Sequence, residues 1–206
     1  MKNIIIVDDH ELFRSGIKVI ISEIGEFNIL EAGNGKEFLQ ILNSIEPDIV
    51  LMDINMPEMD GIKATERALK IFPDLRILVL SMYDDANYYN TFIDLGVKGF
   101  ILKDTDVQEL KRGIESVLND KTYFSQNLLL SLIKERENNT NVDLSDRELD
   151  VLKLIARGLS TQEMSDALHI SFRTVERHRA NLLTKTNTNN SLKLLIFAIK
   201  NRLVEI

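Results

Sequence analysis

The sequence contains no cysteine. This absence excludes disulfide bonds, thiolate metal sites and cysteine nucleophiles, and it is compatible with a reducing compartment. Long hydrophobic runs are also missing, since no apolar stretch approaches the roughly 20 residues of a membrane-spanning helix. The chain starts with a strand-length apolar run, residues 3–7, and shows no cationic leader before it. We therefore expect a soluble protein of the cytoplasm, without a secretion signal.

An excess of negative charge is confined to the first part of the chain. Residues 1–122 contain 13 Lys and Arg against 22 Asp and Glu, whereas residues 142–206 contain 10 against 8, within a net charge of −7. The basic balance at the C-terminal end indicates that any contact with nucleic acid lies there. The acidity of the whole chain does not exclude such contact, because salt screens charges beyond about 10 Å.

Two domains fit the length of 206 residues and the apolar content of 44% better than one. In the first 122 residues, short apolar runs typical of buried strands alternate with segments of helical period. The strand-like runs are residues 3–8, 27–31, 48–53, 76–81 and 98–102, and the helical segments are residues 11–23, 35–44, 61–71, 86–95 and 106–119. Five such units predict a doubly wound α/β fold, a five-stranded parallel sheet with helices on both faces.

Polar residues stand at the ends of four of these strands. Asp8 and Asp9 end the first run, Asp53 the third and Ser81 the fourth, and Lys103 follows the fifth. The carboxyl ends of parallel strands form one edge of the sheet, where such folds bind ligands. A single acid after a strand is more often a turn residue or a helix cap than a nucleophile. The coincidence of these groups on four strands favours a functional site.

Three carboxylates at one edge repel one another unless a cation neutralises them. Oxygen ligands favour a hard ion, and Mg²⁺ fits best. Beside Mg²⁺, the Asp53 carboxylate can act as a nucleophile toward a phosphoryl group, while Lys103 and the Ser81 hydroxyl balance the charge of the phosphoryl oxygens. The pattern therefore indicates formation of an aspartyl phosphate.

The same residues resemble a known family. The acid pair, Asp53 with Met56-Pro57 and Asp60-Gly61 after it, Ser81, and the run Gly99-Phe100-Ile101-Leu102-Lys103 resemble the receiver domain of bacterial two-component response regulators over about the first 120 residues. The resemblance implies a flavodoxin-like sheet with strand order 2-1-3-4-5. It also implies that Asp53 accepts a phosphoryl group from a sensor histidine kinase.

The resemblance further implies which residues bind the metal and which respond to phosphate. Asp9, Asp53 and the backbone carbonyl of Asn55 would ligate Mg²⁺, and Asp8 would assist through a water molecule. Ser81 and Phe100 would form the switch pair, in which the hydroxyl turns toward the phosphate and the aromatic ring follows it inward.

Residues 123–141 would join this receiver-like part, residues 1–122, to a last part, residues 142–206. The second half of the join is polar and rich in asparagine, as flexible linkers are. The first half predicts a short amphipathic helix that packs on one of the domains or, as the less favoured alternative, forms a dimer seam. Its apolar stripe consists of Leu128, Leu129, Leu132 and Ile133.

Capping signals mark the last 65 residues as helical. Ser145 with Glu148 and Ser160 with Glu163 have the spacing of capping boxes, and Ser171 is suited to cap a third helix. We predict an all-α domain of four helices, near residues 146–157, 161–168, 172–186 and 191–202. The short turn between the second and third helices is that of a helix-turn-helix.

The third of these helices would contact DNA. Val175 and Leu182 make one side apolar, and the other side is mostly basic. The runs Leu144-Ser145-Asp146-Arg147-Glu148 and Thr174-Val175-Glu176-Arg177-His178 resemble the LuxR-type DNA-binding domain, so that the whole chain resembles a NarL/LuxR-type response regulator. The resemblance implies that Glu176, Arg177 and Ala180 face bases. It implies contacts to the DNA backbone from Arg173, Thr174, Arg179 and Lys185.

Glu176 departs from this family, in which lysine is common at the same place. A carboxylate there would be repelled by phosphate but could accept a hydrogen bond from N4 of cytosine. The departure concerns the target sequence and leaves the class unchanged.

We therefore expect a DNA-binding transcription regulator that is controlled by phosphorylation. Phosphorylation of Asp53 would favour homodimers, paired through the helix near residues 191–202, that bind promoter half-sites of double-stranded DNA. The apolar stripe of that helix could equally be internal core; it consists of Leu192, Leu195, Ile196 and Ile199. Two alternatives stay open, a DNA binder that ignores phosphorylation and a phosphatase with a phosphoaspartate intermediate. The phosphatase is disfavoured because such enzymes have an acid where this chain has Asn55.

Overall fold

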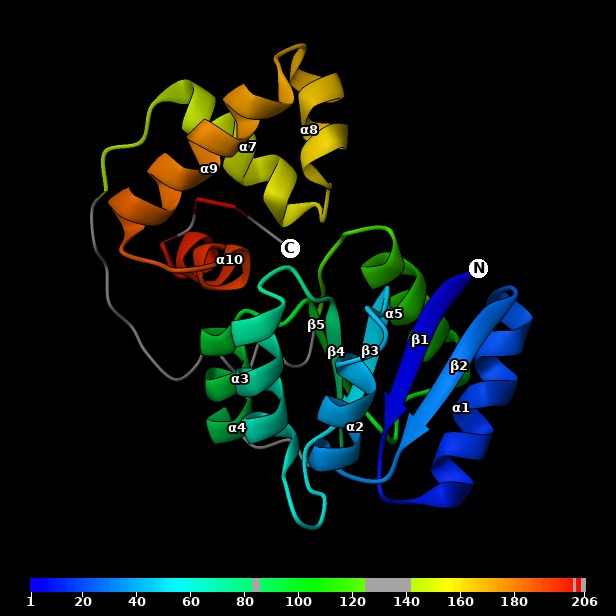
Figure 1. The fold of residues 1–206 in the computed structure, drawn as a ribbon. Helices are drawn as coiled ribbons and strands as arrows, with labels where there is room; N and C mark the ends of the chain where they lie inside the picture. Colours follow the sequence, from blue (N-terminus) through cyan, green and yellow to red (C-terminus); the bar gives the residue numbers. More distant parts are fainter. Residues whose placement is uncertain (83–85, 125–141, 202, 205–206) are drawn as a thin grey trace. The chain divides into compact units, whose positions relative to one another are not determined.

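The computed structural model describes residues 1–82, 86–124, 142–201 and 203–204. The chain divides into two compact units, Met1–Phe124 and Ser125–Ile206, and each is described by itself (Figure 1). The predicted linker helix with its stripe of Leu128, Leu129, Leu132 and Ile133 lies outside the described residues. No helix in the part of the chain that the structure describes combines the length and the apolar character needed to cross a membrane.

The first unit is built on a parallel sheet whose strand order is β2-β1-β3-β4-β5-β6. The strands are β1 (Lys2–Val7), β2 (Phe27–Ala32), β3 (Ile49–Asp53), β4 (Ile77–Ser81), β5 (Gly99–Leu102) and β6 (Tyr123–Phe124). The predicted order 2-1-3-4-5 is confirmed, but the sheet has a sixth strand where the sequence predicted the beginning of a linker. Two residues are too few to show a strand period, so β6 left no signal in the sequence.

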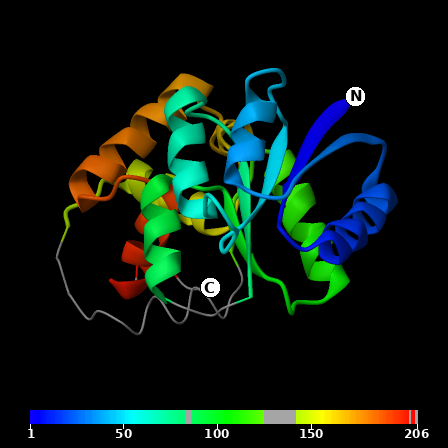
Figure 2. The ribbon, with the colours of Figure 1, turned by 60° about the horizontal axis from the view of Figure 1, so that its bottom comes forward.

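Helices cover both faces of the sheet, as Figures 1 and 2 show. They are α1 (Glu11–Ile24), α2 (Gly35–Leu42), α3 (Gly61–Ile71), α4 (Ala86–Leu95) and α5 (Val107–Leu118). Helices α1 and α5 lie side by side on one face, and α2, α3 and α4 follow one another on the other. All five residues of β3 and of β4 are buried, because strands covered on both faces need no alternation of polar and apolar residues.

Gly61, the first residue of α3, allows that helix to begin against the end of β3. A Cβ atom at this position would lie 2.0 Å from the backbone oxygen of Asp53, which no side chain can tolerate. The Gly61 amide donates to the Ile54 carbonyl at 2.8 Å, and the Asp60 side chain caps the helix by accepting from the Lys63 amide at 2.8 Å. The Asp60-Gly61 pair therefore fixes the loop that follows Asp53.

The second unit consists of four described helices around one apolar core. They are α7 (Asp146–Ala156), α8 (Thr161–Leu168), α9 (Phe172–Thr186) and α10 (Ser191–Lys200). Both predicted capping boxes are present, and the Ser171 side chain accepts from the Thr174 amide, which confirms the third cap. The core is formed by Val151, Leu152, Ile155, Met164, Val175, Leu182, Leu194, Ala198 and Val204.

Helix α10 presents a different face to this core from the one that the apolar stripe suggested. Leu194 and Ala198 are the buried core residues, while Leu195 and Ile199 are only partly buried and flank them. Leu192 is 5% exposed. The stripe is therefore internal core at Leu192 only. Leu195, Ile196 and Ile199 are of intermediate exposure and keep some apolar surface accessible to solvent.

Candidate functional site

Three acidic residues and one histidine gather at the carboxyl edge of the sheet. Asp8 and Asp9 follow β1, His10 comes next, and Asp53 is the last residue of β3. One ligand atom from each of these four side chains can be chosen so that all lie within 4.8 Å of one another. Strands β1 and β3 are neighbours, so the first and third strand ends meet as the sequence predicted.

Lys103 brings the fifth strand to the same cluster. Its Nζ lies 2.5 Å from Asp8 Oδ2 and 2.8 Å from Asp53 Oδ1. The three side chains are 4%, 1% and 6% exposed respectively, so the ion pairs are buried. The ammonium also lies 4.5 Å from the centre of the Phe13 ring, where a cation is attracted by the ring face.

The cluster holds more negative charge than its lysine neutralises. Burial raises the pKa of Asp53, and although the hydrogen bond and charge of Lys103 oppose this, the nearby Asp8 carboxylate adds to it. The excess of carboxylate oxygens over cationic partners is the donor set that a hard divalent cation fits. The structure is thus consistent with a metal site formed by Asp8, Asp9 and Asp53.

His10 is a member of the cluster that the sequence analysis did not identify. Its Nδ1 lies 2.8 Å from Asp9 Oδ1 and 3.2 Å from Asp8 Oδ1, and its amide donates to Asp8 Oδ1 at 2.9 Å. The signal was its place directly after the acid pair. Asn55, by contrast, lies in an exposed position of the loop after β3, and its backbone carbonyl remains a predicted ligand.

Ser81 and Phe100 lie on the adjoining strands β4 and β5 and are 1% and 2% exposed. The Phe100 ring packs edge-on against two rings of α4, with centroids 4.5 Å from Tyr89 and 6.2 Å from Phe92. The aromatic member of the predicted switch pair is therefore buried in this structure and touches α4. Tyr89 had no signal in the sequence, because its partner is eleven residues away on another element.

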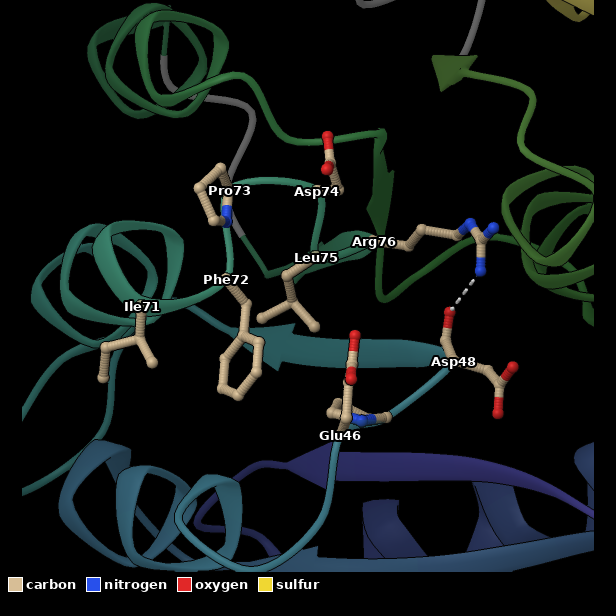
Figure 3. A pocket seen from close by; sticks show the side chains of 9 residues that line it. Glu46, Asp48, Ile71, Phe72, Pro73, Asp74, Leu75 and Arg76 are labelled. Atoms are coloured by element: carbon tan, nitrogen blue, oxygen red, sulfur yellow. Dashed lines mark hydrogen bonds between the residues drawn. The ribbon is translucent and has the colours of Figure 1, made fainter.

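A hollow of about 270 Å³ lies at the opposite edge of the sheet, before β3 and β4 begin (Figure 3). It is lined by residues 46–48 and 71–76. The Arg76 guanidinium donates across it to the Asp48 carbonyl at 3.4 Å. Because Asp48 precedes β3 and Asp53 ends it, this hollow is separate from the acidic cluster.

In the second unit, α9 has one buried side and one exposed side. Val175 and Leu182 are fully buried, which confirms the predicted apolar side. Four of the predicted DNA contacts on this helix lie away from the core: Arg173, Arg177 and Ala180 are exposed and Thr174 is of intermediate exposure. Phe172, which the sequence analysis did not single out, is 52% exposed at the start of the same helix.

Lys185 is engaged inside its own unit. Its Nζ lies 2.7 Å from Glu148 Oε2 and donates to the Asp143 carbonyl at 3.2 Å. Glu148 is 3% exposed; its burial favours the neutral form, but hydrogen bonds from Lys185 and Ser145 outweigh this and lower the pKa to about 2. Arg179 and Glu176 likewise have partners inside this unit, because each is hydrogen-bonded to Thr161 and they pair with each other. The predicted DNA contacts of these three residues remain predictions.

Comparison with known proteins agrees with both units. Residues 4–115 match the response regulator receiver domain, and residues 142–198 match the bacterial regulatory proteins of the luxR family. The transcriptional regulatory protein DegU of Brevibacillus brevis is 33% identical over an alignment of 224 positions, gaps included, which covers 98% of this chain and 95% of the relative. The oxygen regulatory protein NreC of Staphylococcus carnosus is 34% identical over 214 residues, or 98% and 99% of the two chains.

Among solved structures, a complex described as two RcsB dimers bound to two parallel DNAs matches with a TM-score of 0.60. Its identity to this chain is 25%, over 97% of this chain and 98% of the other. The family consists of transcription regulators and not of enzymes, so the phosphatase alternative has no support. The chain belongs to the NarL/LuxR family of response regulators, DNA-binding transcription regulators that join a receiver domain to a LuxR-type helix-turn-helix domain.

Proposed function

We propose that Asp53 is the phosphoacceptor through which a sensor histidine kinase controls the binding of this regulator to DNA. The observation that carries the proposal is the position of Lys103, whose buried ammonium lies 2.5 Å from Asp8 and 2.8 Å from Asp53, the two buried acids of the cluster. The receiver domain implies a kinase partner, and a regulator that binds promoter DNA would act in the cytoplasm. The domains of the proposal are residues 1–122, the linker 123–141 and residues 142–206.

The reaction is a transfer between two covalent carriers. A carboxylate oxygen of Asp53 attacks the phosphorus of a phosphohistidine, the new P–O bond forms as the P–N bond breaks, and the imidazole leaves with the electron pair and takes up a proton. The Lys103 ammonium is positioned to pair with a phosphoryl oxygen beside Asp53. Asp9, Asp53 and the Asn55 carbonyl would hold Mg²⁺, with Asp8 acting through water. Mg²⁺ would supply charge neutralisation for the phosphoryl oxygens.

Ser81 and Phe100 would report the change of charge. Strand β4 runs beside β3, with Asp53 in register with Leu80, so the Ser81 hydroxyl can donate to a phosphoryl oxygen on Asp53. Phe100 is in contact with Tyr89 and Phe92, so any displacement of its ring acts on α4. Phosphorylation would then shift an existing equilibrium between two arrangements of this packing.

The output would be dimerisation and binding to half-sites of double-stranded DNA. Similarity to the RcsB dimers on DNA supports this step, as do the exposed Arg173 and Arg177 on α9. The partly buried apolar residues of α10 are the candidate dimer surface. A dimer presents two copies of α9 to half-sites one or more helical turns apart.

Sedimentation velocity tests the proposal. Wild type and Asp53→Asn are compared with and without Mg²⁺ plus beryllofluoride, which mimics an aspartyl phosphate. We expect a shift to dimer in wild type only. A shift in neither protein would contradict the assembly step, and DNA affinity unchanged by both the mimic and Asp53→Asn would establish the alternative, a DNA binder that ignores phosphorylation.

A further inference from the structure

Arg179 on α9 contacts three neighbours inside the second unit. One guanidinium nitrogen, Nη1, lies 2.6 Å from Thr161 Oγ1 and 2.9 Å from Glu176 Oε1. Another, Nη2, donates to Ser191 Oγ at 2.7 Å. Thr161 is the first residue of α8 and Ser191 the first of α10, so this side chain joins three helices. Its side chain is 29% exposed.

The two other arginines on the exposed side of α9 are in a different situation. Arg173 and Arg177 are exposed, and neither forms an ion pair or a side-chain hydrogen bond with any residue that the structure describes. A phosphate contact requires guanidinium donors that point to solvent and are free to turn. Arg173 and Arg177 meet that requirement, whereas the fork of Arg179 already binds three oxygen atoms.

Glu176 is the residue that Arg179 and Thr161 hold. Its Oε1 accepts from Thr161 Oγ1 at 2.8 Å and from Arg179 at 2.9 Å, while its side chain remains 47% exposed. No residue in the described part of the chain donates to the second oxygen, Oε2. The carboxylate is thus anchored through one oxygen and offers the other to solvent, on the side of the helix that carries Arg173 and Arg177.

A carboxylate that is held by hydrogen bonds can enter the DNA major groove at a lower cost than a carboxylate that moves freely. The adjacent guanidinium offsets part of the charge of Glu176, which weakens the repulsion from phosphate, and fixing the side chain in advance lowers the entropy lost on binding. An ionised carboxylate only accepts hydrogen bonds. In the major groove, the donor that pairs with such an acceptor is the 4-amino group of cytosine.

We propose that Glu176 reads the 4-amino group of a cytosine in the major groove, and that Arg179 and Thr161 are positioning residues that hold its carboxylate for this contact. Arg179 is accordingly not a contact to the DNA backbone. The inference rests on the proposed function of α9 as the helix that enters the groove.

The test begins by selecting a binding site from random double-stranded DNA with the full-length wild-type chain, in Mg²⁺ and beryllofluoride. Affinities are then measured for that site and for every single base-pair change in it. We expect one position that prefers cytosine, by roughly tenfold to a hundredfold. Glu176→Ala should abolish the preference at this position and leave the preferences at all other positions unchanged. Glu176→Gln should change the preferred base to adenine, because a side-chain amide can accept from N6 and donate to N7.

The positioning residues are tested at the same base pair. Thr161→Val, which removes the hydroxyl, and Arg179→Met weaken the cytosine preference, whereas Thr161→Ser retains it. Neither Arg179→Met nor Thr161→Val changes the slope of log affinity against log salt concentration. Arg173→Ala is the matched control: it lowers the magnitude of that negative slope by about 0.9 for each copy of α9, or about 1.8 for a dimer, and leaves the base preferences as they were.

Two results would overturn the inference while leaving the proposed function intact: a selected site whose base preferences do not respond to Glu176→Ala, or a salt slope reduced by Arg179→Met as much as by Arg173→Ala. A wild-type chain that selects no sequence would overturn the proposed function, and the inference with it. Circular dichroism of each variant shows whether it is folded, and Thr161→Ser supports or contradicts the role of the hydroxyl independently of the larger substitutions.

Discussion

Each unit of this regulator contains a buried carboxylate that meets a lysine ammonium, and the two carboxylates behave in opposite ways. Asp53 shares Lys103 with Asp8, and burial raises its pKa. Glu148 shares Lys185 with no other described carboxylate and has the amide and hydroxyl of Ser145 as further donors, and its pKa falls to about 2 although it too is buried. Burial favours the neutral form of both carboxylates; the donors around Glu148 outweigh it, whereas the lysine that Asp53 shares with Asp8 does not.

This difference separates the proposed phosphoacceptor site from a structural ion pair. In the receiver, an acid that is poorly neutralised favours the arrival of a cation, which the proposed phosphoryl transfer would need before an anionic group can approach. In the helix-turn-helix unit, a carboxylate with a full set of donors fixes the start of α7 to the last turn of α9. Substitution of either carboxylate, a change of pH and addition of the metal each test this contrast.

The largest effect is expected from Asp53→Asn. The variant cannot form the acyl phosphate, so incubation with Mg²⁺ and acetyl phosphate should add one phosphoryl group to wild type and none to the variant, as intact mass will show. Removal of a poorly neutralised carboxylate should also leave the first unit at least as stable as before in metal-free buffer. The exposed Asp104→Asn is the control and should be phosphorylated normally. Phosphorylation of Asp53→Asn to the wild-type extent would mean that another residue is the acceptor.

Glu148→Gln should instead destabilise the second unit. The depressed pKa of Glu148 corresponds to about 3 kcal/mol at pH 7, which the neutral side chain would forfeit. Urea unfolding monitored by circular dichroism provides the measurement. Asp150→Asn removes only an exposed pair with Arg147 and should change the free energy of unfolding by less than about 1 kcal/mol. Equal effects of the two substitutions would show that burial of Glu148 contributes nothing.

The two acids should respond to pH with opposite signs. Glu148 has a folded-state pKa of about 2 against an ordinary value of 4.5, so its stabilisation is complete above pH 4.5 and declines as the pH falls toward 2. Between pH 7 and pH 3 the advantage of wild type over Glu148→Gln should shrink by about 2 kcal/mol. The pKa of Asp53 is raised in the folded state, so protonation of this carboxylate stabilises the folded first unit. As the pH falls from 7 to 3, the free energy of unfolding of wild type should therefore increase relative to that of Asp53→Asn. A difference between wild type and Glu148→Gln that does not vary with pH would contradict the assigned pKa.

The smallest effect is expected from the metal. Mg²⁺ at ten times its dissociation constant should stabilise the first unit of wild type by about 1.4 kcal/mol, because it binds only the folded cluster. Thermal unfolding of wild type, Asp53→Asn and Glu148→Gln with and without Mg²⁺ provides the comparison. The increase should be lost in Asp53→Asn and retained in Glu148→Gln. An increase of the same size in all three proteins would mean that the ion binds elsewhere.

The sequence sufficed for the parts of the fold that obey a local rule. Strand ends on one edge place Asp8, Asp53 and Lys103 together because parallel strands share a direction, and the two capping boxes depend only on residues three apart. The missed features have no period and no fixed spacing. They include β6, the ring of Tyr89 against Phe100, and the bond from Lys185 to Glu148, whose partners are 37 positions apart.

The short strand β6 also ties the end of the first unit to its own sheet. Its register places Phe124 opposite Phe100 and Tyr123 opposite Gly99, so these two residues are paired with the strand that carries Phe100. A displacement of β5 would therefore either carry Tyr123 and Phe124 with it or break their pairing. The end of the first unit thus responds to any rearrangement of the strand that carries Phe100.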